Sequence, residues 1–278
     1  IPYFNQFLML YESIFENLNN KYFEYQIIFL HSIYISTEKQ KILYSLDISF
    51  MKLNYYGHPL KIRPMSYRVE FECDFRLVMD VDMIALREPK FDFSFDAQAV
   101  YGGNKFNKGQ WQKICRWLGC NMPSYRIFRI RKGNYKAWCF KEHYFHQTGK
   151  VKKKIFPYIN NGAILIKNSL STALANTWER YRESYTKYIM STEGVDIDME
   201  GQDVIGLAIN SVTDNWSVLP RGCNYALNEK FYFGRRMIRS GTESVSLYHY
   251  INLSEGNLYH HIINNYKELV SKKHFTGS

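Results

Sequence analysis

The first 86 residues alternate between stretches with apolar residues at helical spacing and continuous apolar runs. Residues 4–18 have one apolar face at helical spacing, and residues 25–35 form an apolar run that we interpret as a buried strand. Residues 36–46 begin with hydroxyl side chains suited to capping and are predicted to form a helix. A further strand is expected at 76–86. Because such alternation is typical of parallel sheets covered by helices, the sequence predicts an α/β fold with a largely parallel sheet.

The second half of the chain continues this pattern. Residues 156–167 are predicted to form another strand, and residues 169–190 the longest helix of the chain. A helix is expected to start at 201, and short strands are expected within 216–227 and 244–251.

Between these halves, residues 87–156 lack clear periodicity. They are rich in Lys, Arg, Tyr and Trp, and only residues 110–119 read as a helix. We expect this region to be a long basic insertion. Since no internal repeat or low-complexity linker occurs, we expect one domain over residues 1–278.

Composition limits the classes of partner and compartment. The chain has a formal net charge of +10, which favours an anionic partner without identifying it. No apolar run reaches the roughly 18–20 residues that span a bilayer. The five cysteines form no C-x-x-C pair, so we expect a reducing compartment and no zinc or disulfide framework. The chain begins IPYFNQF, without Met or a signal-like segment, and we expect it to start inside a longer protein.

Two carboxylates interrupt the apolar run RLVMDVDMIAL at residues 76–86. On a strand, Asp80 and Asp82 would project to the same face, where like charges repel. A divalent cation with oxygen ligands, such as Mg²⁺ or Mn²⁺, would remove this conflict. Asp-x-Asp is a weak pattern alone, because a second copy occurs at Asp196 and Asp198, which we interpret as a solvated loop.

The ordered motifs around these aspartates resemble those of GT-A fold glycosyltransferases, most closely glycosyltransferase family 8. The strand followed by Asp-x-Asp carries the resemblance, and the other motifs occur in the family's order. They are the first helix with Ser13-Ile14, the strand and helix IIFLHSIYISTEKQKIL, Tyr67-Arg68-Val69, YINNGAILIK, GQDVIGLAI, VLPRGCNYAL and LYHYI. The resemblance covers most of the chain outside residues 87–156. It implies a Rossmann-like nucleotide-diphospho-sugar transferase fold.

The resemblance also implies an activity, which is transfer of a sugar from a nucleotide sugar, most often a UDP-sugar, with retention of configuration. Carried over by position, Asp80, Asp82 and His249 would bind Mn²⁺ or Mg²⁺ across the diphosphate, with Val81 also in the donor site. A metal there would stabilise the charge of the departing phosphate as a Lewis acid.

The remaining site residues follow from the same resemblance. Arg68 would lie beside the diphosphate, and Asn160 and Asn161 would hydrogen-bond sugar hydroxyls. Gln202 would face the reacting sugar carbon, and Asp203 would lie near donor or acceptor hydroxyls. These two are the predicted catalytic residues. Tyr3 would border the nucleotide base.

This chain also departs from the family pattern. Gly201 replaces the first Asp of the family's Asp-Gln-Asp, which leaves an acceptor-side carboxylate in question. After His249 the chain lacks the family's Lys-Pro-Trp, and the start of the first strand is absent.

Several alternatives stay open. The acceptor implied is a glycan, a lipid-linked molecule or a protein, and an acidic acceptor would suit the net charge. A cytoplasmic location is expected, with peripheral membrane contact as an option. The cationic and aromatic stretches 126–138 and 149–156 would also suit a module that binds single-stranded nucleic acid, which we consider the weaker reading. A transferase-like domain that binds sugar nucleotides without turnover is the third alternative.

Overall fold

The computed structural model divides the chain into two compact units. One comprises Glu24–Met79 and Phe91–Pro220, and the other comprises Pro2–Phe23, Asp80–Lys90 and Arg221–Ser278. The structure describes residues 4–17, 26–31, 35–53, 62–85, 91–101, 106–122, 125–131, 134–135, 138–139, 151–155, 158–191, 200–219, 225–227 and 247–250. Within these ranges, no helix combines the length and apolar character needed to cross a bilayer.

A five-stranded sheet forms the centre of the first unit. Its order is β3 (Phe75–Met79), β10 (Ile159–Lys167), β5 (Ala97–Tyr101), β11 (Trp216–Leu219) and β8 (Trp138–Cys139). β10 pairs antiparallel with both neighbours, and β11 pairs parallel with β5 and antiparallel with β8. Therefore β3, β5 and β11 run in one direction and the other two strands run against them. The predicted α/β fold is confirmed, but the sheet is mixed, since β10 separates β3 from β5.

Strand β10 is the best predicted element of this sheet. Its sequence INNGAILIK is apolar over most of its length, and the run from Asn161 to Ile166 is buried. Such continuous burial is typical of an interior strand covered on both faces. The strand pairing changes register between Asn160 and Ile164, which marks a bulge at the two asparagines and Gly162.

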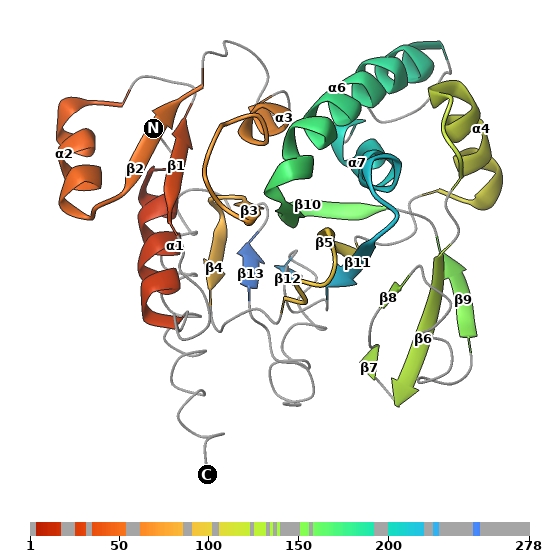
Figure 1. Cartoon of the computed structure of the whole chain (residues 1–278), viewed down its shortest axis with the longest axis horizontal. Coiled ribbons are helices and arrows are strands. Elements are labelled where there is room, and N and C mark those ends of the chain that lie inside the picture. Colours follow the sequence, from red (N-terminus) through yellow and green to blue (C-terminus); the bar gives the residue numbers. More distant parts are fainter. Residues whose placement is uncertain are drawn as a thin grey trace. The chain divides into compact units, whose positions relative to one another are not determined.

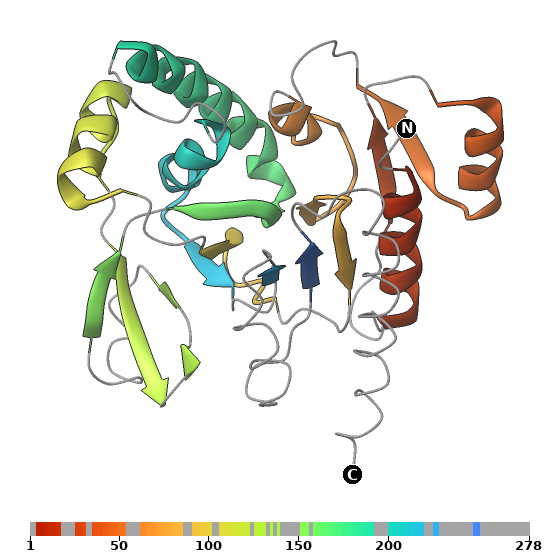
Figure 2. The same ribbon diagram turned by 180° about the vertical axis from the view of Figure 1, so that it is seen from behind.

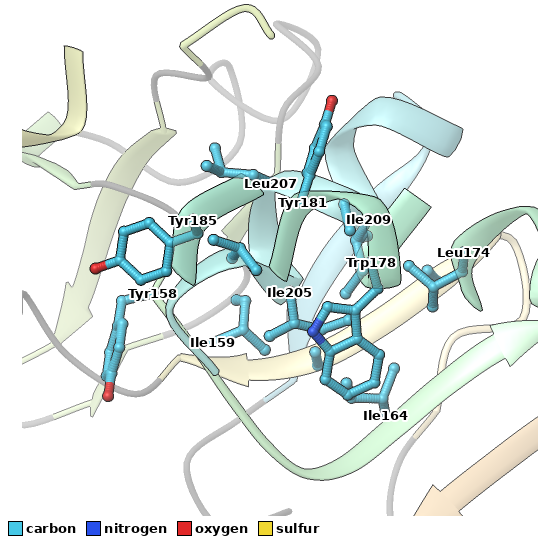
Figure 3. Close-up of a cluster of buried hydrophobic side chains, with 14 of the residues drawn as sticks. Tyr158, Ile159, Ile164, Leu174, Trp178, Tyr181, Tyr185, Ile205, Leu207 and Ile209 are labelled. Carbon is cyan, nitrogen blue, oxygen red and sulfur yellow. The ribbon is translucent and has the colours of Figure 1, made fainter. Parts of the chain in front are cut away.

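Helices α6 (Asn168–Ser191) and α7 (Glu200–Val212) lie together over β10 (Figure 1). The apolar residues of α6 recur at helical spacing and meet those of α7 and β10 in one buried cluster (Figure 3). Leu174, Trp178, Ile164, Ile205 and Ile209 are each at most 1% exposed. Residue burial of this kind supplies most of the stability of a domain.

Strand β5 was not predicted from the sequence. It lies in the middle of the sheet, although its residues fall inside the region 87–156 that was interpreted as an insertion. Its sequence AQAVY is short, and its inward residues Ala97 and Ala99 are small, so it lacks a strong apolar signal. Gln98 is also buried and donates Nε2 to Ser217 Oγ of β11 at 2.9 Å. The region therefore contributes central strand residues as well as peripheral elements.

The predicted helix within that region is α4 (Lys108–Leu118). Asn107 caps its start through a reciprocal capping box with Gln110. Gly119 ends it in a left-handed conformation with φ 66°. Its apolar face, which includes the fully buried Trp111, packs toward α6.

Smaller elements complete this unit. Strands β1 (Ile28–His31) and β2 (Ser49–Lys52) pair in parallel. Helix α2 (Thr37–Ser45) connects them and lies beside them (Figure 2). Ser36 caps α2, as the sequence predicted. The short helix α3 (Ile62–Ser66) contacts α6. A separate sheet of β7 (Asn134–Tyr135), β6 (Tyr125–Arg131) and β9 (Val151–Ile155) contains described parts of the two cationic stretches.

The second unit combines helix α1 (Phe4–Asn17) with a three-stranded sheet. That sheet has the order β12 (Tyr225–Leu227), β13 (Leu247–Tyr250) and β4 (Met83–Ala85). α1 packs along β4, where Ser13 Oγ accepts a 2.9 Å hydrogen bond from the Ala85 backbone. The predicted helix at 4–18 is thereby confirmed.

Candidate functional site

The Asp-x-Asp motif lies in a break between two strands. β3 ends at Met79 and β4 begins at Met83, so the single strand predicted at 76–86 is wrong. Asp80, Val81 and Asp82 form the bend between them, and all three are half-buried. The alternation of side chains along a strand therefore does not orient the aspartates. Their position beyond the carboxyl end of β3 is nevertheless where open α/β sheets bind ligands.

The third predicted metal ligand, His249, lies on a strand that pairs with β4, the strand that follows the aspartates. His249 of β13 pairs with Met83, the residue directly after Asp82. The His249 side chain lies outside the described residues. Among the side chains that the structure does describe, no group of three or more His, Cys, Asp or Glu could hold a metal ion. The donor set itself fits Mn²⁺ or Mg²⁺, because two carboxylates occur within one three-residue bend and a histidine backbone pairs beside them.

The two asparagines occupy the bulge near the start of β10. Asn160 Oδ1 accepts a 2.9 Å hydrogen bond from the Gly162 backbone, which closes a local turn of the chain. Asn161 is 8% exposed. The two asparagines thus interrupt the regular pairing of an apolar strand, and their expected contacts with sugar hydroxyls stay a prediction.

The two predicted catalytic residues stand in the first turn of α7, and each meets a tyrosine. Gln202 is half-buried and donates Nε2 to the Tyr158 hydroxyl at 3.0 Å. Asp203 is fully buried, and its Oδ2 accepts a 3.0 Å hydrogen bond from the Tyr185 hydroxyl. The structure places the Asp203 carboxylate inside the core. Its predicted contact with donor or acceptor hydroxyls stays a prediction.

Both tyrosine hydroxyls are held in the neutral form. Burial, followed by the negative charge of Asp203, raises the pKa of Tyr158 to about 12. Burial, the Asp203 charge and the hydrogen bond to Asp203 raise the pKa of Tyr185 further. Figure 3 shows both rings at one edge of the buried cluster, with their hydroxyl groups directed away from the labelled isoleucines. The hydroxyls therefore act as neutral donors and acceptors at neutral pH.

The backbone of the same turn is fixed by α6. Trp178 Nε1 donates a 2.7 Å hydrogen bond to the Gly201 carbonyl oxygen inside the core. A Cβ at Gly201 would meet Arg182 Cδ and Trp178 Cζ2 at 3.9 Å, which is ordinary van der Waals distance. The residue that replaces the family's aspartate is therefore packed but not crowded.

Arg68, predicted to lie beside a diphosphate, is engaged by α6. Its guanidinium forms an ion pair with Glu179 and donates to Asn176 Oδ1 at 2.9 and 3.1 Å. About a third of each charged side chain is exposed. The structure thus gives Arg68 a role in holding the turn after α3 against α6.

Known structures resemble this chain over most of its length. An active-site mutant of LgtC, a family 8 galactosyltransferase, superposes with a TM-score of 0.51 at 13% identity and covers 91% of this chain and 85% of its own. The glycosyltransferase GlyE of Streptococcus pneumoniae TIGR4 has a TM-score of 0.50 at 14% identity, with coverage of 96% of this chain and 61% of its own. The chain has the GT-A glycosyltransferase fold. No protein-family model and no curated protein sequence matches it.

The GT-A fold confirms the resemblance found in the sequence, and identities this low establish the fold alone. Sequence reasoning missed Tyr158 and Tyr185 as partners of the α7 residues. Tyr158 stands two residues before Asn160 in the recognised strand motif, whereas Tyr185 lies at helical spacing on the buried face of α6, where an aromatic residue gives no functional signal. Tyr3, Asp196 and Asp198 lie outside the described residues.

Proposed function

We propose that this chain is a metal-dependent glycosyltransferase that moves a sugar from a nucleotide sugar, preferably a UDP-sugar, to a glycan, lipid-linked or protein acceptor. The observation that carries the proposal is the Asp80-x-Asp82 bend directly after the end of β3, in a chain with the GT-A fold. In open α/β sheets, this edge is where ligands bind. The net charge of +10 supports an anionic donor or acceptor.

Asp80, Asp82 and His249 would hold Mn²⁺ or Mg²⁺, which when bound supplies Lewis-acid stabilisation to the departing diphosphate. Carboxylate and imidazole ligands both suit Mn²⁺. Val81 spaces the two aspartates within the bend, and Arg68 and Tyr3 complete the donor residues inferred from the resemblance.

Gln202 would act at the reacting sugar. Its carboxamide is planar, so the 3.0 Å hydrogen bond from Nε2 to Tyr158 also fixes the direction of the carbonyl oxygen. An oriented carbonyl dipole can stabilise positive charge that develops on the sugar carbon as the donor bond breaks. Asn160 and Asn161 would hydrogen-bond the sugar hydroxyls. Retention of configuration, with the leaving phosphate helping to deprotonate the acceptor, follows from the resemblance.

Asp203 would support this turn from the core. Its buried carboxylate accepts a hydrogen bond from the Tyr185 hydroxyl of α6. The adjacent Gln202 donates a hydrogen bond to the hydroxyl of Tyr158, which lies just before β10. These two bonds tie the first turn of α7 to both neighbours. Gln202 is thereby held in place before a donor arrives, which is the arrangement that electrostatic catalysis requires.

Calorimetric titration with UDP in the presence and absence of Mn²⁺ tests the proposal. We expect metal-dependent binding that Asp80→Ala plus Asp82→Ala abolishes. The matched control is Asp196→Ala plus Asp198→Ala, which removes the other Asp-x-Asp and should leave binding unchanged. Equal binding by the wild type and the Asp80/Asp82 variant would exclude a metal–diphosphate site there. Incubation with a panel of nucleotide sugars then distinguishes turnover from binding without turnover, the alternative raised by Gly201.

A nucleic-acid-binding function is the second candidate, favoured by the pairing of the two cationic stretches. β6 and β9 are antiparallel, with Arg126 opposite Lys154 and Ile127 opposite Lys153. This reading predicts binding to single-stranded nucleic acid that falls steeply with salt and does not respond to Mn²⁺ or UDP.

A further inference from the structure

Two cysteines flank the end of helix α4. Cys115 is buried in its last turn, and Cys120 is half-buried just after the left-handed Gly119. The Cys120 backbone N–H donates to the Cys115 carbonyl oxygen at 3.0 Å, and the Gly119 N–H donates to the Arg116 carbonyl at 3.3 Å. These two bonds define a Schellman motif, in which the side chains of the first and sixth residues frequently meet. Here those two side chains are thiols.

The Cys115 and Cys120 side chains interact, and both pack against the core cluster that α4 shares with α6. Cys120 also hydrogen-bonds the Tyr181 side chain and lies near the Arg180 charge. A backbone already closed by the motif needs little rearrangement to join the two sulfurs.

We propose that Cys115 and Cys120 form a redox-active dithiol site, which small disulfides of the glutathione class oxidise reversibly to an intramolecular disulfide. Neither residue was expected to form a disulfide from the spacing of the cysteines in the sequence.

The two thiols have different roles in the exchange. The hydrogen bond from Cys115, with help from Tyr181 and Arg180, lowers the pKa of Cys120, although burial opposes this. The hydrogen bond to Cys120 and burial raise the pKa of Cys115. Cys120 is therefore the attacking thiolate, and Cys115 is the resolving thiol.

The reaction balances in two steps. The Cys120 thiolate attacks one sulfur of glutathione disulfide, forms a mixed disulfide and releases one glutathione thiolate, which takes up a proton. Cys115 then loses its proton to solvent and attacks the Cys120 sulfur, which expels the second glutathione. The protein loses two electrons and two protons, and one glutathione disulfide becomes two glutathione thiols.

Tryptic mapping of the full chain tests this site directly, because Arg116 lies between the two cysteines. After exposure to glutathione disulfide, trapping with iodoacetamide and digestion without reductant, we expect peptide 114–116 to be linked to peptide 117–126. Dithiothreitol should separate them. The Cys73→Ser variant, which removes an exposed thiol, should give the same linkage.

Two further variants test the order of attack. In Cys115→Ala, the mixed disulfide with glutathione should accumulate on Cys120, because the resolving thiol is absent. In Cys120→Ser, Cys115 should acquire little glutathione. The proposal is overturned if peptides 114–116 and 117–126 stay separate in the oxidised wild type, if Cys120 pairs with another cysteine, or if iodoacetamide modifies Cys115 faster than Cys120 in the reduced protein.

Discussion

The Tyr185 hydroxyl donates a 3.0 Å hydrogen bond to Oδ2 of Asp203, a carboxylate with no exposed surface. This bond joins α6 to the first turn of α7. A buried carboxylate is costly unless hydrogen-bond donors compensate for the water it has lost. Tyr185 therefore supplies one of the interactions that make the Asp203 carboxyl group tolerable at this position in the core.

Tyr185→Phe should lower the free energy of unfolding by about 1–3 kcal/mol, because it removes a donor from the buried Asp203 carboxylate. Urea denaturation followed by circular dichroism measures this change. Tyr44→Phe is the matched control, since Tyr44 is 70% exposed and should lose less than about 0.5 kcal/mol. Similar losses of unfolding free energy in both variants would show that the bond to Asp203 contributes no more to stability than an exposed tyrosine hydroxyl.

Tyr158→Phe should reduce the proposed sugar transfer by up to about tenfold in kcat, with a smaller change in KM, because Gln202 loses the bond that orients its carboxamide. Steady-state kinetics with the donor found in the nucleotide-sugar screen measures both constants. Gln202→Ala should remove more activity than Tyr158→Phe. If Tyr158→Phe keeps full kcat, Gln202 does not depend on Tyr158 for its position.

Stability should fall in alkali in a way that depends on Tyr158. Its pKa is about 12 in the folded protein and about 10 in an unfolded chain, so above pH 10 the unfolded state releases the proton first. The stabilisation is fully present below pH 10 and is lost by about 2 kcal/mol as the pH rises to 12. Urea denaturation at pH 9, 10 and 11 should show a shallower decline in stability for Tyr158→Phe than for the wild type, and equal declines would contradict the prediction.

Gly201→Ala should raise the free energy of unfolding by about 0.4–1 kcal/mol, because Gly201 is helical and a Cβ there meets its neighbours no closer than 3.9 Å. Gly119→Ala is the paired comparison. No atom lies within 4 Å of a Cβ at Gly119, but its φ of +66° disfavours any side chain, so this variant should lose about 1 kcal/mol. Opposite signs in thermal denaturation are the expected result, and destabilisation of both would contradict the packing described around Gly201.

Arg68 and Glu179 can be separated by variants of each. Because the pair is one-third exposed, Arg68→Ala and Glu179→Ala should each cost only about 0.2–1 kcal/mol of stability. If Arg68 also contacts the donor diphosphate, Arg68→Ala should weaken metal-dependent UDP binding while Glu179→Ala does not. Equal affinities in the two variants would restrict Arg68 to its contact with α6.

The sequence predicted the elements whose signals are local. The helical periodicity of α1 and α6 and the apolar run of β10 are each visible within one stretch of chain. β5 lacked such a signal, because its buried residues Ala97 and Ala99 are small and its central position is set by pairing with β10 and β11, which lie far along the chain. The strand at 76–86 was predicted too long, because the same apolar residues belong to two different sheets.

The candidate site could be predicted only in part for a related reason. Gln202 and Asp203 follow from the order of motifs along the chain. Their tyrosine partners are 44 and 18 residues away in sequence, so these contacts exist only once α6, α7 and β10 have packed. A single sequence therefore indicates candidate site residues, but not the residues that hold them in place.

The central place of β5 bears on how this protein is made. Both of its neighbours, β10 and β11, come later in the chain, at Ile159–Lys167 and Trp216–Leu219. When β5 has just been synthesised, neither of the strands that pair with it exists yet. The sheet cannot be completed until synthesis passes residue 219. Long-range pairing of this kind slows folding and leaves strand edges open to wrong partners in the interval. We therefore expect chains truncated before β10 to aggregate on synthesis, and refolding of the intact chain to be rate-limited by assembly of this sheet.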